Sequence, residues 1–76
     1  MDGYSPVLIR IGLKLVQLRI KNGYKSYESF AIENNLSRMH YWRMEKGKTN
    51  LTIKSLHRVL SIHGVTLEEF FRKDKF

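Results

Sequence analysis

The sequence predicts a compact all-α protein of five helices, and three observations lead to this prediction. The chain has 76 residues, of which 42% are hydrophobic, so it can build one small core. Apolar residues recur at intervals of three and four, and no stretch of useful length alternates as a β-strand does. Each apolar stretch follows a serine or threonine and ends near an asparagine or glycine, which are common helix boundaries. The whole chain, residues 1 to 76, is therefore expected to form a single domain.

The first helix is expected to begin at Ser5-Pro6 and to end at Asn22-Gly23. A serine hydroxyl can cap the first turn, where the missing N–H of a proline costs nothing. The apolar positions that repeat with helical spacing are Ile11, Leu15 and Leu18. This pattern predicts a helix of about four turns.

Two short helices are expected next. Ser26 caps the second helix, which ends at Asn34, and Ser37 caps the third, which covers residues 38 to 46. Only about three residues separate them, a spacing that suits two helices meeting at a steep angle. Residues 26 to 46 therefore have the spacing of a helix-turn-helix.

The last two helices follow threonine caps. Thr52 precedes a helix that ends before Gly64, with one apolar stripe formed by Ile53, Leu56, Val59 and Leu60. Thr66 and Glu69 have the spacing of a capping box, which predicts a short fifth helix carrying Leu67, Phe70 and Phe71.

The charge pattern favours a polyanionic partner. Fourteen Lys and Arg against seven Asp and Glu give a formal net charge of +7. The excess is concentrated in two runs, because residues 10 to 25 carry five basic residues and no acid, and residues 38 to 58 carry six against Glu45 alone. One such run could be a solvated face, but two indicate nucleic acid.

Several function classes are not expected. The absence of cysteine excludes disulfides and thiolate sites and favours a reducing cytoplasm. No metal site and no cofactor are expected, because His40, His57 and His63 lack ligand spacing. No apolar run is long enough for a membrane span, and no export signal is recognised. An enzyme is not expected either, because a pocket would hollow out most of so small a core.

Residues 24 to 47 read Y-K-S-Y-E-S-F-A-I-E-N-N-L-S-R-M-H-Y-W-R-M-E-K-G. This stretch resembles the helix-turn-helix of the Xre family, the Cro and phage-repressor type of DNA-binding protein. The resemblance extends from about Ile11 to the closing G-V-T-L-E-E-F-F at 64 to 71. It implies a lambda-repressor-like fold in which residues 38 to 46 form the recognition helix in the major groove of double-stranded DNA.

The resemblance also implies roles for individual residues. The candidates for base contacts are Arg38, Met39, His40 and Arg43. Either arginine could hold guanine through two hydrogen bonds or bind only a phosphate, and Met39 could meet a thymine methyl or stay an adaptable surface residue. His40 could donate to a base or a phosphate, or take no part.

A second group is expected to contact the DNA backbone and to set register. Its members are Ser26, Tyr27, Ser37, Lys46, Lys48, Thr49 and Asn50. Tyr27 stands where many members of the family have a phosphate-contacting glutamine, so it could instead pack against its neighbours. Asn35 replaces the usual glycine of the turn, which asparagine tolerates.

Three further expectations concern structure. Arg19 and Glu45 match a family salt bridge between the first and third helices. Trp42 occupies a position that is usually polar, and packing against the first helix or a loop is favoured over base stacking or DNA contact. A homodimer is expected because such proteins read paired half-sites, with a surface formed by Phe70, Phe71 and Phe76, although these residues could instead close the core.

The predicted function is sequence-specific double-stranded DNA binding by a small cytoplasmic transcriptional regulator, associated with the nucleoid when bound. Such a regulator would be a stand-alone repressor or a restriction-modification controller. The main alternative is an antitoxin-like protein that mainly binds a toxin or other protein and regulates its own gene. A second alternative is a nucleic-acid binder that uses charge alone and has little sequence preference.

Overall fold

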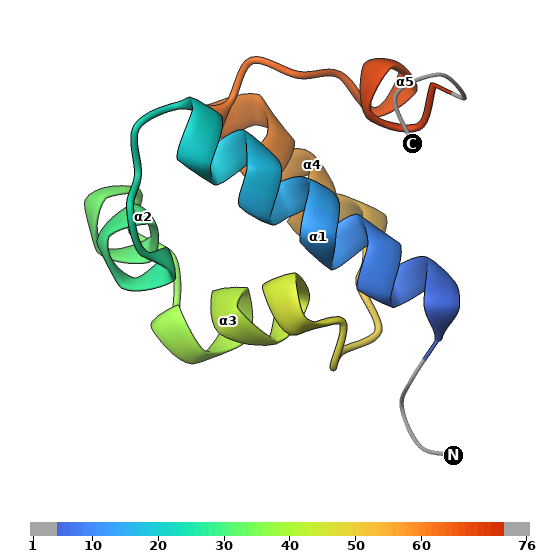
Figure 1. Cartoon of the computed structure of the whole chain (residues 1–76), viewed down its shortest axis with the longest axis horizontal. Helices are drawn as coiled ribbons and strands as arrows, with labels where there is room; N and C mark the ends of the chain where they lie inside the picture. Colours follow the sequence, from blue (N-terminus) through green and yellow to red (C-terminus); the bar gives the residue numbers. More distant parts are fainter. Residues whose placement is uncertain (1–4, 73–76) are drawn as a thin grey trace.

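The computed structural model describes residues 5–72, and within this range it is all-helical. Figure 1 shows the order of the five helices along this part of the chain, which are α1 (Pro6–Lys21), α2 (Tyr27–Glu33), α3 (Arg38–Lys46), α4 (Ile53–Ile62) and α5 (Leu67–Phe70). The all-α prediction is confirmed, and α3 has the bounds expected from the sequence. The second helix ends one residue earlier than expected, with Asn34 as its C-cap.

Local capping explains where the helices begin. The side chains of Ser5, Ser26, Ser37, Thr52 and Thr66 each accept a hydrogen bond from the backbone N–H three residues later. At α5 the bond is reciprocal, because the Thr66 N–H donates to Glu69 Oε1 at 2.9 Å. These bonds satisfy N–H groups that the helix itself leaves unpaired. The five predicted caps are therefore confirmed.

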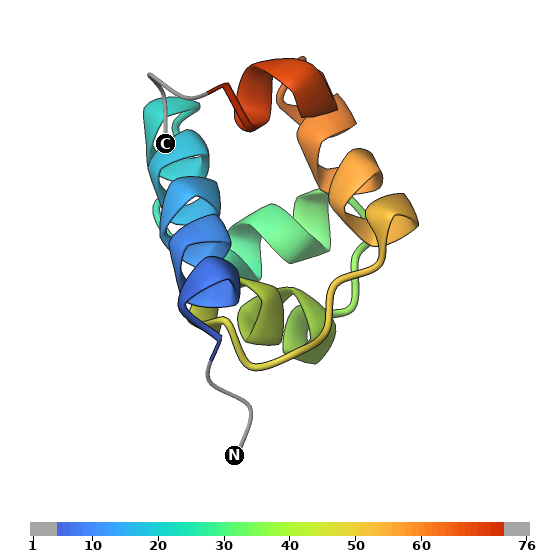
Figure 2. The same ribbon diagram turned by 90° about the vertical axis from the view of Figure 1, so that its right-hand side faces the viewer.

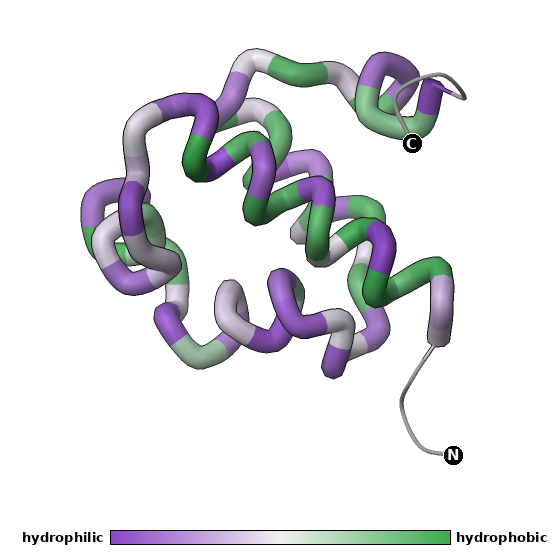
Figure 3. The backbone as a smooth tube through the Cα atoms, in the orientation of Figure 1, coloured by the Kyte–Doolittle hydropathy of each residue, from purple (hydrophilic) through white to green (hydrophobic). Residues whose placement is uncertain are grey.

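In Figure 1, α1 crosses the middle of the view and lies in front of α4. Figure 2 shows α1 and α4 on opposite sides of the fold, with α2 and α3 between them and α5 across the top. The apolar residues buried between the helices are Ile11, Leu15, Phe30, Ala31, Tyr41, Met44, Leu56, Val59, Leu60 and Phe70. In Figure 3 hydrophobic segments of α1 and α4 alternate with hydrophilic ones, whereas α3 is mostly hydrophilic.

The two C-terminal phenylalanines of the described range divide between the core and the surface. Phe70 is only 1% exposed and belongs to the core, so its assignment to a dimer surface is wrong. Phe71 is 43% exposed and lies edge-on to Phe70, with ring centroids 5.1 Å apart. Successive helical residues are rotated by about 100°, which turns one phenylalanine inward and the next outward. Phe76 lies outside the described residues.

The helices are short as well as amphipathic. None of those between residues 5 and 72 has the length and apolar character needed to cross a bilayer.

Candidate nucleic-acid interface

The turn between α2 and α3 is held by bonds on both sides. The Leu36 N–H donates to the carbonyl of buried Ala31 at 2.8 Å. Asn35 has a φ of +58°, the only positive value at a non-glycine residue in the described range, so it fills the role of the family's glycine. From α4, Arg58 Nη2 donates to the carbonyl of Asn35 at 3.1 Å. This arginine belongs to the second basic run, yet its contact is with the turn.

The outer face of α3 carries the candidate base readers. Tyr41, Met44 and Glu45 are buried and define the inner face. With about 100° between successive residues, the opposite face is centred on Met39, Arg43 and Lys46. All three are exposed, and Met39 is 59% exposed.

The other two candidates lie at the sides of this face. Arg38 and His40 are both exposed. Arg38 shares its side of the helix with Trp42, one turn later. His40 lies on the opposite side, where it lines a shallow hollow together with Ser55 and Val59 of α4. All four candidates for base contacts are thus exposed, with Met39 and Arg43 on the outer face and Arg38 and His40 at its two sides.

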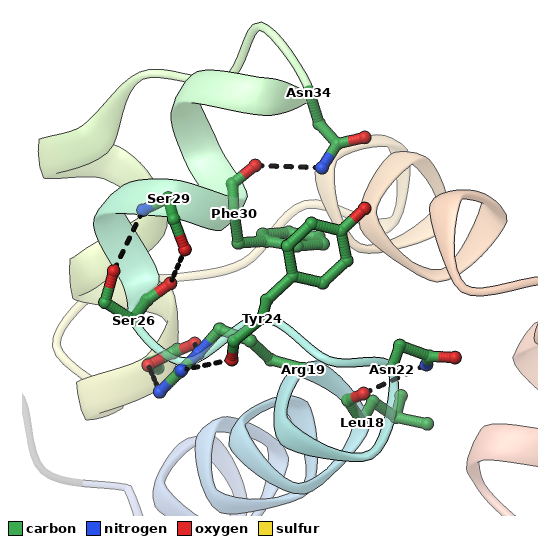
Figure 4. Close-up of polar contacts among 9 residues, drawn as sticks. Leu18, Arg19, Asn22, Tyr24, Ser26, Ser29, Phe30 and Asn34 are labelled. Atoms are coloured by element: carbon green, nitrogen blue, oxygen red, sulfur yellow. Dashed lines mark hydrogen bonds and ion pairs between the residues drawn. The ribbon is translucent and has the colours of Figure 1, made fainter.

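The inner face of α3 is joined to α1 by a buried ion pair. Arg19 Nε donates to Glu45 Oε2 at 2.7 Å, and the second guanidinium contact, from Nη2 to Oε1, is 3.4 Å long. Arg19 Nη1 also donates to the carbonyl of Tyr24 at 3.0 Å, as Figure 4 shows. The two charged residues are 8% and 7% exposed. The expected salt bridge is therefore present, and the same arginine also holds the segment that leads into α2.

Tyr41 lies beside this pair. Its burial raises the pKa of the hydroxyl well above its usual value, and the Glu45 carboxylate raises it further. The hydroxyl thus stays neutral, and the contact between α1 and α3 holds one positive charge from Arg19 and one negative charge from Glu45, which offset each other.

Two glycines set the distance between α1 and α3, and the sequence reasoning had identified Gly47 only as the end of the third helix and had not singled out Gly12. A Cβ on Gly12 would meet the backbone carbonyl oxygens of Glu45 and Met44, the latter at 2.8 Å. At the end of α3, Gly47 has a φ of +69°, and a Cβ there would lie 2.9 Å from the backbone of Ile9. The only signal in the sequence for this close contact was the presence of Gly12 inside an expected helix, because glycine is normally unfavourable there.

The predicted backbone contacts divide into two groups. Ser26 and Ser37 use their hydroxyl oxygens as N-caps, accepting from the N–H groups of Ser29 at 3.0 Å and His40 at 3.2 Å. Tyr27 is half-buried and packs against the core, as the packing alternative expected. Because both caps use only the hydroxyl oxygen, the hydroxyl hydrogen of each serine can still be donated to a phosphate. Both serines also lie at helix starts, where backbone N–H groups favour the binding of an anion.

The second group follows α3. Lys46, Lys48 and Asn50 are exposed and Thr49 is half-buried. The Lys48 N–H donates to the Arg43 carbonyl at 2.9 Å, so the chain folds back over the last turn of the helix. Lys48 Nζ lies 5.3 Å from the centre of the Trp42 ring. Trp42 is half-buried, in agreement with the expectation that it packs against a loop.

His63 belongs to the fold rather than to this surface. Its ring stacks on Phe30 with centroids 4.9 Å apart, and its Nδ1 lies 3.0 Å from Asn22 Nδ2, which makes the nitrogen an acceptor. Burial lowers the pKa of His63. The neutral ring therefore joins the end of α4 to the end of α1.

Comparison with known proteins gives two relatives and no structural match. The control protein C.MunI of Mycoplasma sp is 38% identical over 67 residues, which cover 88% of this chain and 90% of that protein. The plasmid copy control protein CopR of Streptococcus agalactiae is 40% identical over 50 residues, or 66% of this chain and about half, 54%, of its own length. No family model matches the chain. No solved structure matches it either.

Proposed function

Because the chain belongs to the Xre family of helix-turn-helix regulators, the Cro and phage-repressor type, we propose that it controls transcription by binding one specific double-stranded DNA sequence. DNA binding and transcriptional regulation are the activities of this class of small proteins. The sequence specificity and the residues that provide it are the finer parts of the proposal. Both relatives are named as control proteins, which supports a regulatory rather than a catalytic role.

The observation that carries the proposal is the contrast between the two sides of α3. Its inner side is anchored through Arg19 and Glu45, while Met39, Arg43 and Lys46 project from the outer side. A helix that is rigidly attached and exposes long basic and apolar side chains can enter a major groove about 12 Å wide. In this arrangement Arg43 faces the base edges, with Arg38 and His40 at the sides.

Phosphate contacts would set the register of this helix. Two kinds of phosphate site flank the base-facing surface in the sequence. The helix starts at Ser26 and Ser37 come before it, and the loop from Lys48 to Asn50 comes after it. N–H groups at helix starts and lysine side chains bind phosphates without reading sequence. Their part in binding is to hold α3 at a defined depth.

The protein is proposed to act as a homodimer, because one α3 reads only a few base pairs and paired half-sites double the contact. Of the phenylalanines expected at such a surface, Phe71 is the one within residues 5–72 that is exposed. The spacing of the bound sequence tests this part of the proposal.

Selection from a random pool of duplex DNA tests the function. We expect enrichment of a palindrome whose half-sites are about one helical turn, roughly 10 base pairs, apart. Enrichment of a single half-site would contradict the dimer but keep the regulator. If no sequence is enriched over repeated rounds and binding depends only on salt, the result would contradict sequence-specific regulation and favour binding by charge alone. Co-purification of an unrelated small protein in place of DNA binding would favour the antitoxin-like alternative.

A further inference from the structure

We propose that Trp42 is a positioning residue for DNA binding, which holds the ammonium group of Lys48 ready for a phosphate at the edge of the major groove. The inference rests on the proposed function and adds to it a residue that does not itself need to contact DNA. Three features of the described residues lead to it: the place of Trp42 on α3, the folded-back course of the chain at Lys48, and the absence of a competing carboxylate.

The first feature is the position of the tryptophan. Trp42 is half-buried and lies between the inner face of α3 and the outer face centred on Met39 and Arg43. A large apolar ring at this place would be costly to leave fully in water. Lys48 lies over the ring, with Nζ 5.3 Å from its centre, within the range of a cation–π interaction.

The second feature is the backbone that carries Lys48. Gly47 takes the left-handed conformation, with a φ of +69°, and its N–H and that of Lys48 bond to carbonyls of the last turn of α3. Gly47 is also packed against Ile9, so the cap cannot move freely. The Cα of Lys48 is therefore fixed relative to Trp42, and only the flexible side chain remains to be ordered. A lysine side chain loses rotamer entropy when it is immobilised, so a ring that orders it in advance favours the bound state.

The third feature is the chemistry of the partner. A carboxylate would hold the ammonium group but would also neutralise its charge. The face of an aromatic ring attracts the ammonium group without neutralising it. The charge and the N–H donors of the ammonium group stay available for a phosphate oxygen on the other side. Glu45 is the nearest acidic residue along the chain, and its carboxylate is bound by Arg19 on the inner face. Within residues 5–72 the partner shown for Lys48 is the ring of Trp42.

A double-mutant cycle on DNA binding tests the role. Wild type, Trp42→Leu, Lys48→Gln and the double variant are titrated at low salt against a labelled duplex of mixed sequence, because phosphate contacts act on any duplex. We expect Trp42→Leu to weaken binding about two- to fivefold when Lys48 is present and to have no further effect in the Lys48→Gln background. Trp42→Phe should retain part of the effect, because phenylalanine offers a weaker ring.

Lys46→Gln is the matched control, since Lys46 is another exposed cation at the end of α3 without the ring contact. In the double variant with Trp42→Leu, the loss of affinity should equal the product of the fold losses of the two single variants, as expected for residues that act independently. Thermal unfolding of each variant checks that α3 stays folded. In the free protein, NMR should show the Lys48 methylene protons shifted by the ring current of Trp42, the only tryptophan of the chain, and the shift should vanish in Trp42→Leu.

The outcomes separate this role from the proposed function. Equal losses from Trp42→Leu in both Lys48 backgrounds would show that Trp42 acts through the packing of α3, and would overturn the inference while leaving the regulator intact. An unshifted Lys48 side chain would overturn it in the same way. If wild type binds no duplex even at low salt, the proposed function and this role are overturned together.

Discussion

The side of α3 that meets α1 and the side that faces solvent differ in how firmly their side chains are held. On the inner side, Glu45 is bound by Arg19, and the backbone touches Gly12 so closely that a single added carbon has no room. On the outer side, Met39 and Arg43 are exposed. The inner side is therefore expected to determine whether α3 is in place, and the outer side to determine what it recognises.

The same contrast applies to the positive charge. Arg19 bonds to Glu45 and to the Tyr24 carbonyl, and Arg58 bonds to the Asn35 carbonyl, so both arginines hold the helix-turn-helix together. Arg38, Arg43, Lys46 and Lys48 are exposed on or beside α3. The Arg19–Glu45 pair cancels within the net charge of +7, so the whole excess lies on the remaining residues.

The largest expected effect is the loss of one partner of the buried pair. Arg19→Met leaves the Glu45 carboxylate buried without its counter-charge, which should lower the free energy of unfolding by about 3–5 kcal/mol. The double variant Arg19→Met with Glu45→Leu removes both charges and should recover much of this loss. Urea denaturation of the three proteins measures the difference. A double variant no more stable than Arg19→Met would show that the pair contributes through packing alone.

Gly12→Ala is expected to have the next largest effect. Alanine favours helix over glycine by up to about 1 kcal/mol, but its Cβ would collide with the backbone of α3. We expect a net loss of about 1–3 kcal/mol in the free energy of unfolding, together with weaker DNA binding because α3 must shift. Leu13→Ala, on the exposed side of the same helix, is the control and should change stability by less than about 0.5 kcal/mol. Unchanged stability in Gly12→Ala would contradict the close contact.

Substitutions on the outer side should have the reverse pattern. Arg43→Ala is expected to leave the free energy of unfolding within about 0.5 kcal/mol of wild type and to remove about 1–3 kcal/mol of discrimination at one base position.

Lys48→Ala should weaken binding to all sequences alike and reduce the slope of log affinity against log salt by about 0.9. Binding assays on the selected sequence and its single-base variants measure both. Equal, sequence-independent losses would show that Arg43 does not read a base.

The smallest expected effect is a pH dependence from His63. Burial lowers the pKa of His63 in the folded state, so the unfolded chain takes up the proton first as the pH falls. Its contribution to stability is therefore complete above the unfolded pKa of about 6.5 and declines below it. The difference in free energy of unfolding between wild type and His63→Gln, measured from pH 8 to pH 5 (a range of about three units around that pKa), should shrink toward the acid end. A constant or widening difference would contradict the burial of a neutral ring.

Most of the helix boundaries could be predicted because their causes are local. A serine or threonine bonds to the N–H three residues later, and this pattern is visible at Ser5, Ser37 and Thr66 before any tertiary contact forms. The candidates for base contacts followed from the family resemblance together with their positions on one helix. Their exposure follows from helical periodicity, but contact with DNA stays a prediction.

The sequence by itself determined the five helices of the described range, the helix-turn-helix register and the excess of positive charge. The pairing of Arg19 with Glu45 followed from family resemblance, since no rule of spacing joins residues 26 positions apart. Only the tertiary structure decided that Phe70 is buried and that Gly12 sets the approach of α1 to α3. It also decided that Arg58 bonds to the Asn35 carbonyl and that Lys48 lies over the Trp42 ring. The physical reason is that each of these depends on how helices meet in space, whereas caps and periodicity depend on neighbours along the chain.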